Sequence, residues 1–209
     1  MQKLKIPFLA ISFFVLISCA SHKVVDGYTN KTPETKVYNA PYFSNLETDY
    51  VYKANITIYG NELTGIFIAK KIDEATHRVV FTTEFGNKLI DVEVSENDFK
   101  VNSIVSELDR KIVINTLEAD FRLLLRKQYT VQEQLENFEN TVYMSVEGKL
   151  FNYVFTSKSD GKLLKIVQTS DRKEKINLSF TSENNIFAQR ILITHQNIKL
   201  KIEFNYFKP

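Results

Sequence analysis

The sequence predicts a mainly β protein of the α+β class, built on one large antiparallel sheet of about 11 strands with helices across its open side. Alternation of apolar and polar residues recurs at intervals of roughly 10 residues along most of the chain. One central stretch changes to helical spacing, and aromatic residues make up 12% of the 209 residues. A sheet this large must curl, and its apolar face then encloses a cavity or a core.

Residues 1–18 have the three parts of a secretory signal peptide: two lysines, an apolar run and a small residue before the cut. The apolar run is shorter than the roughly 20 residues that a membrane span needs. The motif Leu16-Ile17-Ser18-Cys19 resembles the lipobox of bacterial lipoproteins, whose cysteine is acylated after cleavage. We therefore expect Cys19 to be the lipidated first residue of the mature protein, because several acyl chains together give stable anchoring.

Composition excludes several function classes. Cys19 is the only cysteine, so its acylation leaves no thiol for a disulfide, a zinc-thiolate site or a nucleophile. Cleavage would remove two of the 27 basic residues and none of the 25 acidic ones, leaving a formal charge of zero. That balance gives no support for a nucleic-acid partner.

The segment 19–46 is expected to be the lipidated cysteine followed by a flexible tether, because no period of 2 or 3.6 persists in it. No aspartate follows Cys19, which favours an outer-membrane, periplasm-facing location. The folded domain is expected over 47–209, with about 190 residues in the mature chain, enough for one domain.

Five strands joined by short turns open this domain, and they indicate a meander with one polar face. They are expected from Tyr50 to Ile58, Glu62 to Lys71, Arg78 to Thr83, Lys88 to Ser95 and Phe99 to Ile104.

The period then becomes helical, with apolar residues three and four apart from Ile112 to Leu125. Asn115 and Glu118 resemble a capping box, so two helices are expected, over 103–112 and 116–127. The polar segment 128–140 is expected to be a short helix or a loop. Six further strands follow, over 142–147, 150–156, 163–169, 175–181, 187–194 and 198–207.

Signs of catalysis and of metal or cofactor binding are missing from the sequence. It contains no Gly-rich phosphate loop, no nucleophile elbow and no zinc-binding histidine pair. Of the three histidines, His22 falls in the tether, and His77 and His195 are expected at the surface of separate strands. We therefore expect a protein that is not an enzyme.

One hairpin turn, Glu84-Phe85-Gly86-Asn87, is unusual. Gly86 and Asn87 suit the positive φ angles of a tight turn. Phe85 does not fit, because a phenyl ring left in water forgoes about 2 kcal/mol of burial. Phe85 either folds back onto the core or projects as an apolar tip that touches a membrane or a partner.

The chain resembles the LolB family of outer-membrane lipoprotein receptors over about residues 50–207. The resemblance rests on the lipobox, the segment His77 to Val94 with its Phe85-Gly86 turn, Ile114-Asn-Thr-Leu117 and the terminal strand Ile198 to Phe207. The family usually has leucine at the turn and tryptophans elsewhere, whereas this chain has Phe85 and no tryptophan.

The resemblance implies an incomplete antiparallel barrel with a helical lid over an apolar cavity that holds the acyl chains of client lipoproteins. It implies a monomer that receives clients from a periplasmic LolA-type carrier without a cofactor, and that uses Phe85 and Gly86 to insert them into the outer membrane. The alternatives are a scaffold or interaction lipoprotein and a general lipid-binding protein. The candidate cavity residues are apolar positions of the strands and helices: Ile56, Ile58, Ile66, Ile68, Val80, Ile90, Val92, Leu117, Phe121, Leu124, Ile166, Leu178 and Leu200.

Overall fold

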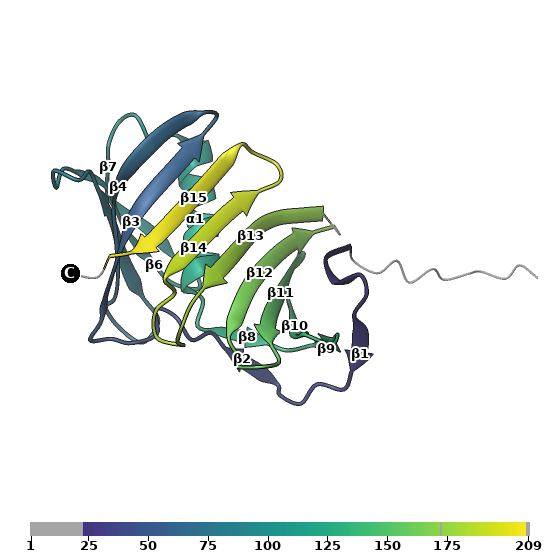
Figure 1. The fold of residues 1–209 in the computed structure, drawn as a ribbon. Coiled ribbons are helices and arrows are strands. Elements are labelled where there is room, and N and C mark those ends of the chain that lie inside the picture. Colours follow the sequence, from purple (N-terminus) through teal and green to yellow (C-terminus); the bar gives the residue numbers. More distant parts are fainter. Residues whose placement is uncertain (1–22, 172, 208–209) are drawn as a thin grey trace, which may run out of the picture.

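A computed structural model describes residues 23–171 and 173–207 as a strongly curved antiparallel sheet with one α-helix on its concave side (Figure 1). The helix, α1, spans Lys111–Leu125, and a short 3₁₀ turn spans Lys23–Val25. The N-terminal half of the sheet region contains β1 Thr29–Lys31, β2 Val37–Asn39, β3 Asp49–Ile58, β4 Asn61–Lys71, β5 His77–Thr82, β6 Lys88–Val94 and β7 Phe99–Ile104. After α1 come β8 Gln128–Thr130, β9 Glu133–Glu136, β10 Asn140–Glu147, β11 Leu150–Ser157, β12 Leu163–Ser170, β13 Lys173–Thr181, β14 Arg190–His195 and β15 Leu200–Tyr206.

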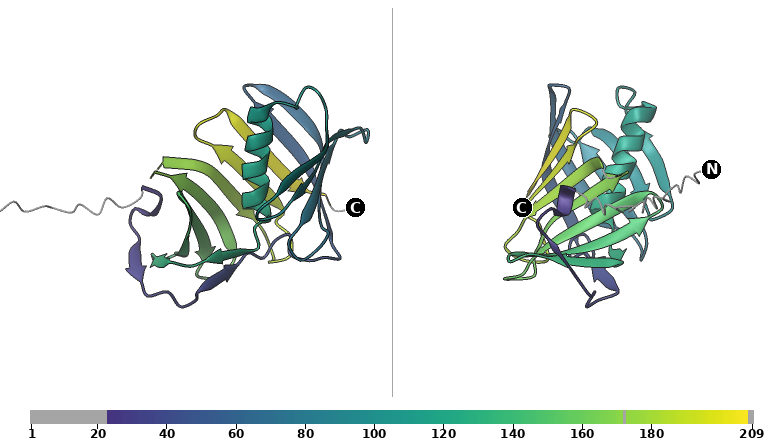
Figure 2. Two further views of the ribbon diagram at one scale, coloured as in Figure 1. Left: turned by 180° about the vertical axis from the view of Figure 1, so that it is seen from behind. Right: turned by 90° about the vertical axis from the view of Figure 1, so that its right-hand side faces the viewer.

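Thirteen strands form the main sheet in the order β1-β9-β10-β11-β12-β13-β14-β15-β3-β4-β5-β6-β7. β1 and β7 do not pair with each other, so the barrel is incomplete. Register shifts in β5, β6, β11 and β12 mark bulges, which bend strands and increase their twist. Seen from behind, α1 crosses the concave side of the curved sheet (Figure 2). The predicted fold class, a mainly β incomplete barrel with a helical cover, is confirmed.

All eleven predicted strands are present, within a few residues of their expected limits. The interpretation of residues 19–46 as an irregular flexible tether is wrong for the part that the structure describes. There β1 pairs with β9, β2 pairs with β8, and Tyr42 and Phe43 are buried in the main core. The strands β1 and β2 are three residues long, too short to show an alternating period.

The prediction of two helices is also wrong, because α1 is one continuous helix. Residues 103–110 complete β7 and form a turn in which Leu108 and Asp109 donate to the carbonyl of Val105. Asn115 lies within the helix and caps nothing, while the N-cap is Arg110, which makes no side-chain capping bond. The segment 128–140 holds β8 and β9 instead of a helix or loop.

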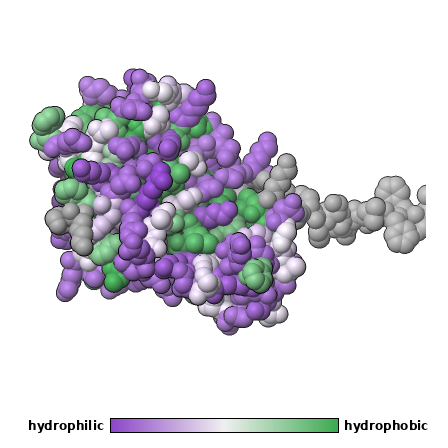
Figure 3. All heavy atoms as spheres, viewed as in Figure 1, coloured by the Kyte–Doolittle hydropathy of each residue, from purple (hydrophilic) through white to green (hydrophobic). Residues whose placement is uncertain are grey.

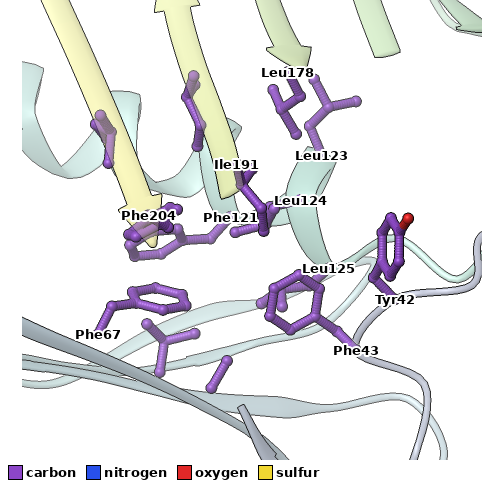
Figure 4. Packing of buried hydrophobic residues seen from close by; sticks show 14 of the residues in the cluster. Tyr42, Phe43, Phe67, Phe121, Leu123, Leu124, Leu125, Leu178, Ile191 and Phe204 are labelled. Carbon is purple, nitrogen blue, oxygen red and sulfur yellow. The ribbon is translucent and has the colours of Figure 1, made fainter. Parts of the chain in front are cut away.

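The main core lies between the sheet and α1. Phe67 of β4 lies 4.3 Å from Phe204 of β15 and 5.7 Å from Phe121 of α1, measured between ring centroids (Figure 4). Gly65 permits the close approach of β4 and β5, because a Cβ there would lie 2.1 Å from the carbonyl oxygen of Thr82. A second, smaller cluster on the other face of β10–β12 contains Val25, Leu135, Tyr153, Phe155 and Val167, among others.

Candidate functional site

Two hollows lie beside α1 where it crosses the sheet. The first has a volume of about 600 Å³ and the second about 670 Å³. Asn115 and Ala119 of α1, with Leu150 and Gln168 of the sheet, line both, so the hollows are neighbours. Asn115 and Ala119 share one face of the helix because they are four residues apart. Each volume lies within the range of about 300–1,000 Å³ that is usual for small-molecule sites.

Apolar, polar and charged side chains together line both hollows. Tyr42, Phe43, Leu123 and Leu125 line the first hollow, together with charged residues that include Arg122 and Glu147. Ile112, Ile176 and Ile198 line the second hollow, together with Gln168, Ser170 and His195. This mixed lining offers a ligand both apolar surface and polar groups.

Polar contacts hold α1 on both flanks. On the side of the first hollow, Arg122 donates to Glu118 at 3.0 Å and to the carbonyl of Ser95, in the β6–β7 turn, at 2.7 Å. On the side of the second hollow, Nε2 of His195 lies 2.8 Å from Oδ1 of the fully buried Asp120. Burial is the largest single influence on His195 and opposes its protonation, but the hydrogen bond to Asp120, the charge of Asp120 and the hydrogen bond with the carbonyl of Leu200 together raise the His195 pKa. The carboxylate of Asp120 keeps one buried oxygen, Oδ2, without a hydrogen-bond partner among the described residues.

The side chains of both described histidines are buried, which corrects the expectation of surface histidines. Nε2 of His77 lies 2.7 Å from the carbonyl oxygen of Phe43, and burial lowers the His77 pKa. His22 lies outside the described residues. Over 23–171 and 173–207 no group of three or more potential ligands could hold a metal ion, and no helix is long and apolar enough to cross a membrane.

None of the thirteen candidate cavity residues lines either hollow. Those that are buried belong to the packed main core: Ile90, Val92, Leu117, Phe121, Leu124, Ile166, Leu178 and Leu200. Ile56 and Ile58 are partly buried against this core. The interior between α1 and the middle of β3–β6 is thus filled by side chains, and the open space lies at the ends of β4–β6 and beside β11 and β12.

The placement of Ile66, Ile68 and Val80 in the interior is wrong. On β4 the buried residues are Gly65, Phe67 and Ala69, and on β5 they are Val79 and Phe81, so the three candidates lie on the outer face. Both faces of β4 carry apolar side chains, and the two-residue period alone does not tell which face is inside.

Phe85 projects from the molecule, with 94% of its surface exposed. The backbone beneath it is fixed by its own turn, in which Gly86 donates to the carbonyl of Thr83 at 3.0 Å and Asn87 donates to the Thr83 hydroxyl at 3.1 Å. Gly86 adopts a φ of +84°, as a glycine at this position should. Of the two alternatives, folding back is excluded and projection is observed.

A second projecting phenylalanine was not predicted. Phe138, in the turn between β9 and β10, is 96% exposed, and after Phe138 and Phe85 the most exposed large apolar residues, Tyr59 and Ile112, reach only 63%. Its sequence signal was a lone aromatic in the polar run Glu136-Asn-Phe-Glu-Asn140. Cys19, the predicted lipidation site, lies outside the described residues.

No protein-family model matches the chain, and the comparison with curated proteins finds no similar sequence. Among solved structures, a LolA superfamily protein from Nitrosomonas europaea is similar, with a TM-score of 0.52 and 10% identity, over 81% of this chain and 88% of that one. The chain has the fold of that LolA superfamily protein. A DUF1329 family protein from Desulfovibrio piger matches with a TM-score of 0.43 and 12% identity, over 78% of this chain and 86% of that one.

Proposed function

We propose that this protein is an acylated envelope lipoprotein that receives lipoproteins from a periplasmic LolA-type carrier and inserts them into the outer membrane. Client acyl chains would enter the two hollows beside α1, and Phe85 would help to transfer them into the bilayer. Cys19 would anchor the protein to the periplasmic face of that membrane. Its action requires no catalytic group, because the acyl chains move between successively better apolar environments.

The observation that carries this proposal is the fully exposed Phe85 on a preformed turn of a sheet whose concave side holds lined hollows. Packing of the sheet alone does not require a phenyl ring in water, so the exposed ring supports a contact outside this molecule. The fold, shared with a LolA superfamily protein, supports the proposal without choosing between carrier and receptor.

The test replaces Phe85 by glutamate in the source organism, with expression of the wild-type copy shut off. We expect outer-membrane lipoproteins to accumulate in the periplasm in complex with their carrier, since a carboxylate at the tip resists transfer into an apolar phase. Ile186→Glu is the matched control, because Ile186 is also an exposed apolar residue in a turn, at 56% exposure. It should leave sorting intact.

Native mass spectrometry of the purified protein adds a second measurement, and bound acylated ligand is the expected result. Intact sorting in the Phe85→Glu strain together with a ligand-free protein would contradict the proposal and favour a scaffold or interaction lipoprotein. Bound lipid with intact sorting would favour the general lipid-binding protein.

A further inference from the structure

The turn between β9 and β10 is built to hold Phe138 away from the rest of the molecule. Oδ1 of Asn137 accepts hydrogen bonds from the backbone N–H groups of Glu139 at 2.9 Å and Asn140 at 2.7 Å. The backbone N–H of Asn137 donates to the carbonyl of Asn140 at 3.0 Å, and that of Lys158 donates to the carbonyl of Glu139 at 2.8 Å. These hydrogen bonds fix the backbone of the turn, so the exposed ring of Phe138 is held at a fixed position.

The first described residues of the chain are fastened beside this turn. β1 pairs antiparallel with β9, so that Thr29 lies opposite Glu136, and the amide of Asn140 donates to the Tyr28 hydroxyl at 3.3 Å. The ring of Tyr28 packs edge-on against Phe155, at 5.8 Å between centroids, and Val25 is buried in the second apolar cluster. The segment that leads back to Cys19 is therefore held next to Phe138.

Only four residue steps separate Cys19 from Lys23, the first residue that the structure describes. Four extended residues span at most about 14 Å. The predicted lipid anchor must therefore attach close to the corner of the molecule that contains Phe138. The Phe85 turn lies far from it, since β10 and β5 are eight strand-to-strand steps apart in the sheet order, or about 38 Å along the sheet. Figure 1 places β1 and β6 at opposite ends of the sheet.

Partly exposed apolar side chains lie near the Phe138 turn, and the exposed Glu139 follows Phe138 directly. Val24, Tyr28 and Leu164 are only partly buried where they pack against the second cluster. Figure 3 shows hydrophobic side chains gathered over the region of β11 and β12, on the same side of the molecule. The nearby carboxylate of Glu136 is neutralised by Lys158 at 2.9 Å and Lys31 at 3.4 Å. Glu139 apart, such a surface suits an apolar phase better than a strongly charged protein partner.

We propose that Phe138 inserts into the phospholipid bilayer in which Cys19 is anchored, and so sets the resting orientation of the client-free protein. This inference rests on the lipid anchor of the proposed function. The anchor keeps the bilayer at high effective concentration beside the turn, so a single ring is enough to fix the orientation. Phe85 then lies at the end of the sheet away from the anchor, free to meet an arriving carrier.

The absence of tryptophan from the chain allows a direct test. The full-length protein, acylated in the cell, is reconstituted into vesicles of phosphatidylcholine with a minor share of phosphatidylglycerol. Phe138→Trp places a reporter on the turn, and Tyr59→Trp places one on the β3–β4 turn as the control. We expect the Phe138→Trp emission to shift to the blue and to be quenched by doxyl-labelled lipids, while Tyr59→Trp shows neither change.

Emission from Phe138→Trp that stays water-like and unquenched in vesicles, with acylation confirmed by mass spectrometry, would overturn the inference. A protein partner would then be the better explanation of the exposed ring. Because the assay uses neither client nor carrier, it fails independently of the sorting test with Phe85→Glu. A protein that is not acylated at Cys19 would overturn the anchor, and with it both proposals.

Discussion

Asp91 is the residue that fixes the strands presenting Phe85. It lies in β6 with 2% of its side chain exposed, and it accepts two hydrogen bonds from Arg78 of β5, at 2.9 and 2.7 Å. Lys88 donates to it at 2.7 Å and Asn102 of β7 at 3.4 Å. Hydrogen bonding to Arg78 holds the Asp91 pKa far below its ordinary value. The carboxylate thus joins three strands at the base of the turn.

Asp91→Asn should therefore destabilise the protein in a pH-dependent way. A carboxyl whose pKa is depressed by folding adds stability above its unfolded pKa of about 3.9, and this stability disappears as the pH falls through the folded value. We expect a loss of about 2 kcal/mol at pH 7, at the low end for a buried pair because Arg78 and Lys88 are half-exposed. Urea unfolding from pH 7 down to pH 2 measures it.

The control for this prediction is Asp49→Asn, because Asp49 pairs with Lys70 where both side chains are more than half exposed. It should change the free energy of unfolding little at any pH. A loss in Asp91→Asn that stays constant as the pH falls would show that packing, and not charge, is responsible.

At the residue scale the sequence predicted which turns exist better than where side chains point. Gly86 and Asn87 identified the turn, but only the structure decides that Phe85 projects, because a ring on a tight turn can lie on either side of it. The same limit explains Ile66 and Ile68, which alternate with Phe67 on a strand that is apolar on both faces. A period of two shows that alternate residues point to opposite faces of the strand, but it does not show which face points into the core.

At the scale of elements, the N-terminus of α1 lacks stabilising groups, whereas its C-terminal turn is stabilised by burial. Arg110 is its N-cap without a capping bond, Lys111 follows, and the first turn has no acidic residue, all of which oppose the helix dipole. Its last turn is buried through Leu123, Leu124 and Leu125. Helical spacing predicted the existence of this helix. Its first residue depends on where β7 ends, and the spacing of apolar residues gives no information about that boundary.

Arg110→Asp should stabilise α1, because an aspartate at the N-cap accepts a backbone hydrogen bond and carries the charge that the dipole favours. The expected gain is about 1 kcal/mol, which for a protein of this size raises Tm by about 3 °C. Thermal unfolding followed by circular dichroism measures it. Arg110→Ala removes the positive charge without supplying an acceptor and should gain less, and an equal gain in both variants would refute the capping explanation.

At the scale of the whole molecule, the eleven long strands followed from alternation, but the ends of the sheet did not. β1 and β9 pair across more than 100 residues of sequence, and β2 pairs with β8 across 89 to 93 residues. Strands of three or four residues are too short to show an alternating pattern. They form because they pair with strands that are distant in the sequence. The sequence therefore predicts a tether over 19–46, although residues 23–46 close one end of the sheet and hold the chain beside Phe138.

The position of the two hollows beside α1 is also a property of the whole molecule, because residues of α1 and of distant strands line them together. Ala119 lines both hollows and is half-buried on the face of α1 that meets Leu150 and Gln168. Ala119→Phe should place a ring in the shared space, so that lipid no longer copurifies with the protein. The fold should persist, because replacing alanine by phenylalanine costs an α-helix only about 0.5 kcal/mol in propensity.

Lipid extracted per mole of protein measures the effect, with circular dichroism as the check on folding. Ala119→Ser is the matched control, because it changes the same position without filling the hollows, and its lipid content should equal that of the wild type. If Ala119→Phe retains as much lipid as Ala119→Ser, the acyl chains do not bind beside α1. The packed interior around Phe67 and Phe121 would then have to open to admit them, which requires α1 to break its contacts with Ser95 and His195.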